Sequence, residues 1–327
     1  MIISRTPFRI SFFGGGTDFP EFYAEHGGAT LLTTIDKYCY LSVHALSPFF
    51  KHRFRANYAR TESVLHPAEF QHPLVRETLL YLDVRQGLEI SHAADLPGRT
   101  GLGSSSSFTV GLLHALHRFL GQRVTAEDLA REAIHIERER VGDSGGHQDQ
   151  YAAAYGGLIR LDFLPSRRVR VTQVALPEAR IEELERSLLL FYFGVEDSAQ
   201  QTLAEQKQRT RQNTAALLEM LKLVDTAETI LTAGRLTDFG DLLDEAWQRK
   251  KTLAAGISNA AIDAAYAAAR AAGARGGKLC GAGGRGFLLL YADPERQPAV
   301  RAALSGLQEV RFALPSEGSR IIFENAG

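Results

Sequence analysis

The chain has 327 residues, of which 45% are apolar and 23% are charged, and its formal net charge is −1. This length is sufficient for two domains with buried cores, and the near-neutral charge excludes a general electrostatic affinity for nucleic acid or anionic membranes. The two cysteines, Cys39 and Cys280, have neither disulfide nor metal-ligand spacing, which favours a reducing compartment. No signal peptide or apolar run of bilayer length is visible. We therefore expect a cytoplasmic protein whose partners are small molecules, not nucleic acid or membrane; no apolar stripe predicts its oligomeric state.

The first half of the chain predicts short strands and helices in irregular alternation. Residues 2–13 are rich in β-branched and aromatic residues and predict a strand that runs into Gly14-Gly15-Gly16. Residues 30–44 predict a hairpin that turns at Asp36-Lys37. Thr125, with Asp128 three residues on, predicts an N-cap. The remaining elements expected here are strands at 53–58, 88–92 and 158–163 and helices at 72–81, 104–120 and 126–138.

The pattern changes between Pro165 and Pro177, where a basic stretch and two prolines predict a domain boundary. We expect an N-terminal domain at 1–175 and a C-terminal domain at 176–327. The irregular order of strands and helices favours an α+β fold over a doubly wound parallel sheet. In the second domain we expect strands at 188–193 and 287–291 and helices at 198–233, 236–255 and 260–272, the first of them breaking near Thr226.

The most informative stretch is Gly101-Leu102-Gly103-Ser104-Ser105-Ser106-Ser107, which lies between a predicted strand and a predicted helix. Glycine lets backbone N–H groups approach one point, and the start of a helix leaves N–H groups without partners, so such a loop suits phosphate. Serine hydroxyls add donors for phosphate and ligands for Mg²⁺. The loop has neither the lysine of a Walker A motif nor the third glycine of a dinucleotide fingerprint. The alternative, a turn whose serines only cap a helix, remains open at this point.

Three further polar, glycine-rich clusters lie at junctions between predicted elements. Asp18 follows a glycine-threonine turn and suits sugar hydroxyls, with Arg9 upstream to pair with a carboxylate or phosphate; a simple helix cap is the alternative. Glu137 precedes the loop 142–150, whose acids suit Mg²⁺ binding or general-base catalysis, unless they are merely solvated. The stretch 278–286 contains enough glycine for a close backbone approach to a ligand, or for a tight connection between strands.

Taken together, three motifs resemble those of the GHMP kinases, the superfamily of galactokinase, homoserine kinase, mevalonate kinase and phosphomevalonate kinase. They are Pro7-Phe8-Arg9 with Gly16-Thr17-Asp18, then Gly101-Leu102-Gly103-Ser104-Ser105, then Gly281-Ala282-Gly283. Within the superfamily, Gly14-Gly15-Gly16-Thr17-Asp18 and Gln148-Asp149-Gln150-Tyr151 are most similar to the D-glycero-D-manno-heptose 7-phosphate kinases, with L-fucokinase-type enzymes as near relatives. The resemblance implies a ribosomal S5 domain 2-like N-terminal domain, a ferredoxin-like C-terminal domain, and a cleft between them for ATP, Mg²⁺ and a sugar.

The resemblance also implies roles for individual residues. Asp149 falls at the catalytic aspartate of the sugar and mevalonate kinases, and Arg9 at the arginine that galactokinases keep beside it. Mg²⁺ would be held by Glu137 and by Ser105 or its neighbour Ser104. The ATP phosphates would be bound by Gly101, Leu102, Gly103, Ser104, Ser105 and Ser106. The sugar would be bound by Gly15, Gly16, Thr17, Asp18, Gly281, Ala282, Gly283 and Gly284.

The implied activity is ATP- and Mg²⁺-dependent phosphorylation of the anomeric hydroxyl of D-glycero-D-manno-heptose 7-phosphate to the 1,7-bisphosphate. Two departures bear on the substrate: Arg285 interrupts the third glycine run, and Phe193-Gly194-Val195-Glu196-Asp197 lacks the arginine that heptose kinases commonly carry there. Arg285 either replaces that charge or lies in solvent. An unphosphorylated sugar such as L-fucose therefore remains an alternative, as do a mevalonate-type alcohol and a catalytically silent nucleotide-binding regulator.

Overall fold

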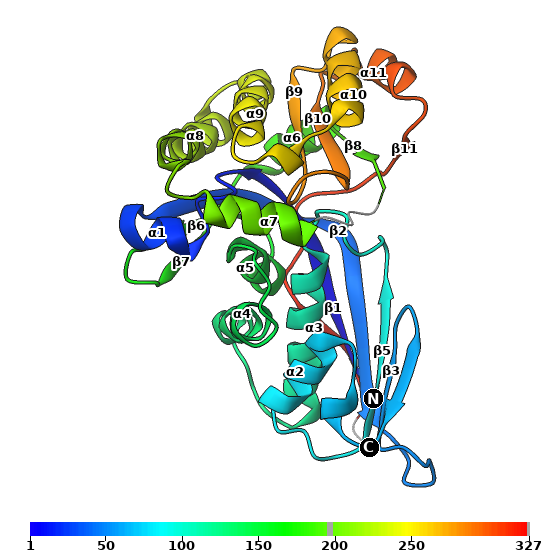
Figure 1. The fold of residues 1–327 in the computed structure, drawn as a ribbon. Coiled ribbons are helices and arrows are strands. Elements are labelled where there is room, and N and C mark those ends of the chain that lie inside the picture. The colour runs from blue at the N-terminus through cyan, green and yellow to red at the C-terminus, as the bar shows by residue number, and fades with distance from the viewer. Residues whose placement is uncertain (195–198, 326–327) are drawn as a thin grey trace.

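The structure is a computed structural model that describes residues 1–194 and 199–325. The chain forms two β-sheets, a larger one from the N-terminal half and a smaller one from the C-terminal half, and helices pack against both (Figure 1). Helices and strands are mixed in each half, which confirms the predicted α+β class.

The larger sheet is built mainly from the first half of the chain. Its strands are β1 (Ile2–Phe13), β2 (Gly28–Ala45), β3 (Phe54–Asn57), β4 (Thr61–Val64), β5 (Leu88–Ala94), β6 (Leu158–Phe163), β7 (Val169–Gln173) and β12 (Arg320–Glu324). They follow the order β12-β1-β2-β5-β3-β4, with β6 and β7 continuing from β2. β3 and β5 are parallel, whereas the other neighbours are antiparallel. β2 pairs with β6 through its first half and with β5 through its second, and β1 runs beside both halves.

β2 is one continuous strand, so the hairpin predicted at Asp36-Lys37 is wrong. The backbone N–H of Asp36 donates to the carbonyl of Ala313 at 3.1 Å. In return, the Asp36 carboxylate accepts from the N–H of Ala313 at 2.9 Å. These polar residues lie where β2 meets the C-terminal segment, which satisfies their hydrogen bonds without a turn.

A central helix covers one face of the larger sheet. The helices of this half are α1 (Pro20–His26), α2 (Pro73–Tyr81), α3 (Ser104–Phe119), α4 (Ala126–Ile134) and α5 (Gln148–Tyr155). α3 packs on β1 and β2, and α2, α4 and α5 lie against it (Figure 1). Val110, Leu112 and Leu113 of this helix have no exposed surface. The N-terminus of α3, where the serine-rich loop ends, is therefore held by the core.

The helix predicted at 126–138 differs from the prediction in its last turns. Thr125 and Asp128 form the reciprocal hydrogen bonds of a capping box, as expected. After Ile134, however, the chain continues as a π-helical segment, His135–Arg140. Such segments are rare in proteins and are frequent at functional sites. This one carries Glu137, which is buried.

The smaller sheet has the ferredoxin-like strand order that the resemblance implied. Its strands are β8 (Leu188–Tyr192), β9 (Gly276–Leu279), β10 (Phe287–Tyr291) and β11 (Gln308–Glu309), in the antiparallel order β11-β8-β10-β9. This is the order fourth, first, third, second along the chain. The helices of this half are α6 (Glu178–Ser187), α7 (Ala199–Gln208), α8 (Thr214–Ala233), α9 (Leu236–Lys251), α10 (Ala260–Ala271) and α11 (Gln297–Ala303).

Two expectations about the C-terminal half need correction. The long helical stretch is interrupted between Gln208 and Thr214, whereas Thr226 lies inside α8, where its hydroxyl donates to the Lys222 carbonyl at 3.3 Å. The chain also returns at its end to the larger sheet, because β12 pairs with β1. The last strand of the predicted C-terminal domain, 176–327, therefore belongs to the larger sheet. Before that strand, the chain passes from the larger sheet to the smaller one near residue 175.

The two halves are joined at the end of β1. The ring of Phe239 on α9 meets the rings of Phe12 and Phe13 edge-on, at centroid distances of 5.3 and 5.2 Å. The ammonium of Lys278 on β9 donates to the carbonyls of Ser11 and Phe12, at 2.7 and 3.0 Å. These contacts fix the strand that carries Arg9 against the second sheet.

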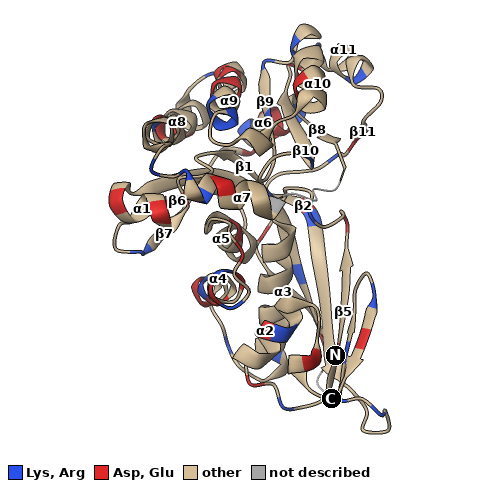
Figure 2. Ribbon diagram, viewed as in Figure 1, with Lys and Arg blue, Asp and Glu red and all other residues tan. Residues whose placement is uncertain are grey.

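Basic and acidic residues are interspersed along the chain, as the ribbon in Figure 2 shows for α4 and α9. This mixing is in line with the formal net charge of −1. Within residues 1–194 and 199–325, no helix combines the length and the apolar character that crossing a bilayer requires.

Candidate active site

A cavity of about 390 Å³ lies where the two sheets meet. Its walls bring together all three predicted motifs, which are far apart in the sequence. The residues from these motifs and their neighbours that line it are Arg9, Ser11, Gly15, Gly16, Asp18, Gly101, Gly103, Ser104, Ser105, Gln148, Asp149, Lys278, Gly281 and Ala282.

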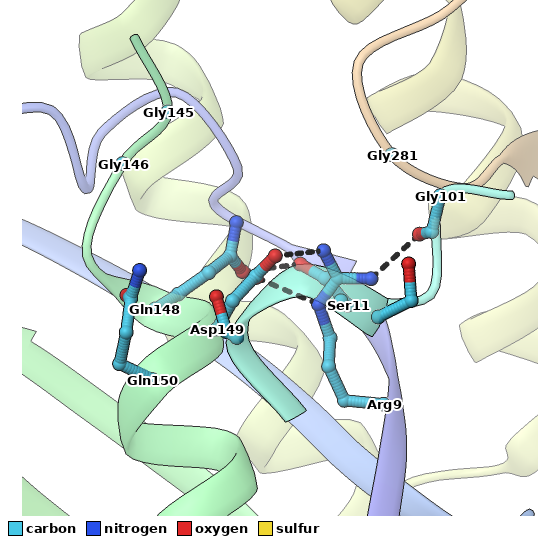
Figure 3. Close-up of polar contacts among 12 residues, drawn as sticks. Arg9, Ser11, Gly101, Gly145, Gly146, Gln148, Asp149, Gln150 and Gly281 are labelled. Atoms are coloured by element: carbon cyan, nitrogen blue, oxygen red, sulfur yellow. Dashed lines mark hydrogen bonds and ion pairs between the residues drawn. The ribbon is translucent and has the colours of Figure 1, made fainter. Parts of the chain in front are cut away.

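Arg9 and Asp149 form a two-point ion pair in this cavity (Figure 3). Arg9 Nε donates to Asp149 Oδ1 at 2.8 Å, and Nη2 donates to Oδ2 at 2.6 Å. The third guanidinium nitrogen, Nη1, donates to the carbonyl of Gly101 at 2.7 Å. Burial alone would lower the pKa of Arg9, but the Asp149 carboxylate outweighs it and raises this pKa above its ordinary value. Arg9 is therefore a fixed cation that orients both Asp149 and the glycine-serine loop that contains Gly101.

Asp149 itself lies in the first turn of α5, one residue inside the helix. A helix N-terminus stabilises a carboxylate through its partial positive charge. The Asp149 side chain keeps 20% of its surface exposed, compared with 6% for Arg9. One carboxylate can therefore be held by Arg9 and still be reached from the cavity.

The glycine-serine loop touches the third motif directly. Gly101 and Gly103 have left-handed φ values of +80° and +76°, which glycine adopts without strain. A Cβ on Gly101 would lie 2.3 Å from the Cys280 carbonyl oxygen, and a Cβ on Gly281 would lie 2.4 Å from the Gly101 Cα. Only glycine allows these two loops to approach so closely, so the contact explains why both motifs are glycine-rich.

The serines of this loop have different environments. α3 begins at Ser104, and its first amides have no partners inside the helix. Ser104 and Ser105 line the cavity, whereas Leu102 is buried in the core. Ser106 is also buried, and its hydroxyl donates to Glu137 Oε2 at 2.9 Å. The serine that contacts Glu137 is therefore Ser106, which its place in the helical turn directs inward, whereas Ser104 and Ser105, the serines predicted to bind Mg²⁺, line the cavity.

Glu137 is buried behind the serine loop and is not part of the cavity wall. Its Oε2 also accepts from Gln150 Nε2 at 2.6 Å. Within the described part of the chain, Glu137 Oε1 and Gln150 Oε1 are buried without a hydrogen-bond partner. Burial raises the pKa of Glu137, although Arg138, 3.7 Å away, opposes this shift.

This donor set fits a small hard cation. Two buried oxygens lack a donor, and Mg²⁺ takes oxygen ligands and commonly binds through one or two carboxylates together with substrate phosphates. Among residues 1–194 and 199–325 there is no group of three or more His, Cys, Asp or Glu side chains that forms a metal cage by itself. A Mg²⁺ ion here would therefore need phosphate oxygens to complete its coordination.

The first glycine motif divides into a cavity wall and a structural turn. Gly15, Gly16 and Asp18 line the cavity. Asp18 accepts from the N–H groups of Gly16 and Gln148, at 2.9 and 3.3 Å, and burial raises its pKa. The Thr17 hydroxyl instead donates to the backbone carbonyls of Gly14 and Ala29, and its side chain is fully buried. The Thr17 hydroxyl therefore holds the turn, and the contact of Thr17 with a sugar stays a prediction.

The third motif divides in the same way. Gly281 and Ala282 line the cavity. Gly283 packs on the backbone of Ile257, and the N–H of Gly284 donates to the Ile257 carbonyl. Gly283 and Gly284 thus support the loop from behind, and their predicted contact with the sugar stays a prediction.

The expectations about the missing arginine concern residues that are only partly described. Phe193 and Gly194 follow β8, whereas Val195, Glu196 and Asp197 lie outside the described residues. The Arg285 side chain is exposed, passes beside Gly194 and does not line the cavity between the sheets.

Sequence reasoning missed several polar residues of the site. Lys278 lines the cavity although it is almost fully buried, and burial lowers its pKa well below the usual range. Gln148 and Gln150 flank Asp149 and contact Ser11 and Glu137, respectively. For the two glutamines, the sequence did contain one indication: they lie directly before and after the expected catalytic aspartate.

A second cavity of about 760 Å³ adjoins the first one. Ser104, Ser105 and Arg99 line both. Its walls are more apolar, and there the His72 ring stacks on Phe108 with a centroid distance of 5.1 Å. Burial lowers the pKa of His72, which keeps this ring uncharged near neutral pH.

Two family models match the chain: the N-terminal domain of the GHMP kinases at residues 72–157, and the C-terminal domain of the GHMP kinases at residues 223–308. The chain belongs to the GHMP kinases, which confirms the resemblance seen in its three motifs.

Relatives of known name fall in the same family. The chain is 28% identical over 315 residues to the D-glycero-alpha-D-manno-heptose 7-phosphate kinase of Campylobacter jejuni, with 93% of each chain covered. It is 27% identical over 323 residues to the bifunctional fucokinase/GDP-fucose pyrophosphorylase of Arabidopsis thaliana, covering 91% of this chain but 30% of that longer protein. The crystal structure of a D-glycero-D-manno-heptose 1-phosphate kinase from Bacteroides thetaiotaomicron matches with a TM-score of 0.82 at 25% identity, and both chains are covered completely.

Proposed function

We propose that this protein is an ATP- and Mg²⁺-dependent sugar kinase that phosphorylates the anomeric hydroxyl of D-glycero-D-manno-heptose 7-phosphate to the 1,7-bisphosphate. One observation carries the proposal: the Arg9–Asp149 pair and the serine loop face one cavity. A proton acceptor and a phosphate cradle are thereby within reach of one bound substrate. The name of the Campylobacter relative supports the choice of sugar.

The nucleotide would span both cavities. Its phosphates would meet Gly101, Gly103, Ser104 and Ser105, which line the first cavity at the start of α3. Its base would enter the second cavity, where the stacked His72 and Phe108 rings offer an apolar surface. The shared residues Ser104 and Ser105 make the two cavities a continuous binding surface for a molecule with an apolar and an anionic end.

The chemistry would be a direct phosphoryl transfer. Asp149 would accept the proton of the anomeric hydroxyl. The oxygen of that hydroxyl would form a bond to the γ-phosphorus of ATP, while the bond between this phosphorus and ADP breaks. Arg9 would keep the carboxylate in place through its two hydrogen bonds. The backbone amides at the start of α3 would stabilise the charge on the transferred group. When bound, Mg²⁺ would neutralise phosphate charge, and Glu137, Gln150 and Ser106 would hold it.

An unphosphorylated sugar is the second candidate. The predicted position of the heptose kinase arginine holds none, Arg285 lines neither cavity, and one relative is named as a fucokinase. A silent regulator is disfavoured because such a protein has no need for the Arg9–Asp149 pair.

The test is ADP release with ATP·Mg²⁺ against D-glycero-D-manno-heptose 7-phosphate, mannose and L-fucose, followed by ³¹P NMR of the product. Fast turnover on the 7-phosphate with a new anomeric phosphate supports the proposal. Turnover on L-fucose or mannose alone would identify an unphosphorylated sugar as the substrate in place of the heptose 7-phosphate. ATP binding without turnover on any sugar would support a catalytically silent regulator.

A further inference from the structure

The side-chain amide of Gln148 is held in one orientation at the cavity wall. Its Oε1 accepts from the Ser11 hydroxyl at 2.7 Å. Ser11 is itself 7% exposed, and its carbonyl accepts from the buried Lys278 ammonium at 2.7 Å. The backbone of Ser11 is thus anchored, and its hydroxyl holds the Oε1 end of the Gln148 amide on the side of Ser11.

The other end of this amide, Nε2, is a donor without a partner in the described part of the chain. Figure 3 shows Nε2 on the side of Gln148 that faces away from Ser11. It lies 3.7 Å from the position that a Cβ would take on Gly15, which also lines the cavity. The absence of a side chain at Gly15 leaves room for a ligand atom beside this nitrogen.

Gln148 and Asp149 therefore present a donor and an acceptor side by side from consecutive residues of α5. The complementary ligand has an oxygen that accepts a hydrogen bond next to a hydroxyl that gives up its proton. A cyclic hemiacetal has this pattern, because its anomeric hydroxyl shares a carbon with the ring oxygen. A simple alcohol has no such ether oxygen, and most other hydroxyls of a sugar have only hydroxyl groups as neighbours.

We propose that Gln148 Nε2 donates to the ring oxygen of the sugar, so that Gln148 and Asp149 together select the anomeric hydroxyl as the group that is phosphorylated. This inference rests on the proposed function and adds to it a residue that chooses the reacting hydroxyl. Gln148 contacts the substrate, whereas Ser11 is a positioning residue that acts through the Gln148 amide.

The test compares the sugar that the enzyme accepts with its carbasugar analogue, in which a CH₂ group replaces the ring oxygen. We expect the wild-type enzyme to lose about 10-fold in kcat/KM on the analogue through this contact, since the donor that the bound analogue covers then has no partner. Gln148→Met should lose about as much on the natural sugar, and its ratio of kcat/KM between sugar and analogue should be about 10-fold smaller than that of the wild type. The lower acidity of the analogue's hydroxyl affects both enzymes equally, so it cancels when the two ratios are compared.

Two further variants separate recognition from folding. Ser11→Ala leaves Gln148 in place but frees its amide, so the ratio of kcat/KM between sugar and analogue should fall toward that of Gln148→Met while KM for ATP stays the same. A merely structural role of Ser11 would lower activity on both substrates and leave the ratio unchanged. Gln122→Met, a change of the same type at an exposed residue outside both cavities, should keep the wild-type ratio.

The outcomes distinguish this inference from the proposed function. An anomeric product with an unchanged ratio in both Gln148→Met and Ser11→Ala overturns the role of Gln148 and leaves the proposed function standing. A product phosphorylated at another hydroxyl overturns both.

Discussion

Two carboxylates lie on either side of the serine loop, and their surroundings are opposite. Asp149 faces the cavity, keeps a fifth of its side chain exposed and has both oxygens bound by Arg9. The Glu137 side chain is 1% exposed, lies behind the first turn of α3, and leaves one oxygen without a donor among the described residues. The nearest arginine nitrogen is 2.6 Å from Asp149 but 3.7 Å from Glu137.

This difference indicates how two acids of the same type are given different tasks. A carboxylate that is already charge-paired and reachable from the cavity suits the transient acceptance of a proton from a substrate. A carboxylate that is buried and not fully paired is costly unless a cation joins it. The cavity wall thus favours a base at Asp149, and the buried position favours a cation ligand at Glu137.

The largest expected effect is that of Asp149→Asn, which keeps the shape of the side chain and removes the proton acceptor. We expect turnover with the sugar to fall at least about 100-fold. The dissociation constant of ATP, measured by calorimetry, should change less than about 3-fold, since in the proposed function Asp149 contacts the sugar and not the nucleotide. Turnover within 10-fold of the wild type would show that Asp149 is not the base.

Glu137→Gln tests the other side of the comparison. In the complex with a non-hydrolysable ATP analogue, we expect the affinity for Mg²⁺ to fall about 100-fold, at the upper end of what the loss of even an outer-shell partner costs. The measurement is calorimetric titration of Mg²⁺. Asp149→Asn is the matched control and should leave the affinity for Mg²⁺ unchanged. A larger loss of this affinity in Asp149→Asn than in Glu137→Gln would mean that Asp149, and not Glu137, is the Mg²⁺ ligand.

The same substitution should have a smaller effect on stability, and its sign follows from the raised pKa of Glu137. The folded state holds this proton to a higher pH than the unfolded chain does, so the stability contributed by this group is present at low pH and is lost as pH rises. Without Mg²⁺, Glu137→Gln should therefore be more stable than the wild type at pH 8, by about 1 kcal/mol, the scale of a buried polar atom without a partner. At pH 4 the difference should nearly vanish.

Denaturant unfolding at pH 4, 6 and 8 in the presence of a chelator measures this difference. An equal difference at all three values would mean that Glu137 does not titrate between them.

The sequence was sufficient for the parts of the site that depend on local pattern. The glycine-serine loop at the start of α3 and the capping box at Thr125 each follow from a few adjacent residues. The strand order of the smaller sheet and the pairing of Arg9 with Asp149 came only from the resemblance, because no periodicity in the chain reports contacts between distant segments.

The sequence could not assign side chains to their tertiary partners. Thr17 was expected to meet a sugar, and its hydroxyl holds the Gly14 turn. Ser106 was expected among the residues that bind the ATP phosphates, and its hydroxyl contacts Glu137, because the direction of a side chain depends on its exact place in the helical turn. The hairpin predicted at Asp36 was wrong because the hydrogen-bond partner of Asp36 is Ala313, which lies far along the chain.

The smallest expected effect concerns the cation that would recognise a 7-phosphate. Arg285 is exposed, lines neither cavity and, among the described residues, forms no ion pair, in contrast to Arg9, which is buried and bound at three nitrogens. Arg285→Ala should therefore change KM for the heptose 7-phosphate less than about 2-fold, the scale of an exposed charge. KM for mannose or L-fucose, where either is accepted, is the internal control. A 10-fold increase for the phosphorylated sugar alone would mean that Arg285 reaches the substrate when it binds, and that this exposed loop supplies the charge absent at the end of β8.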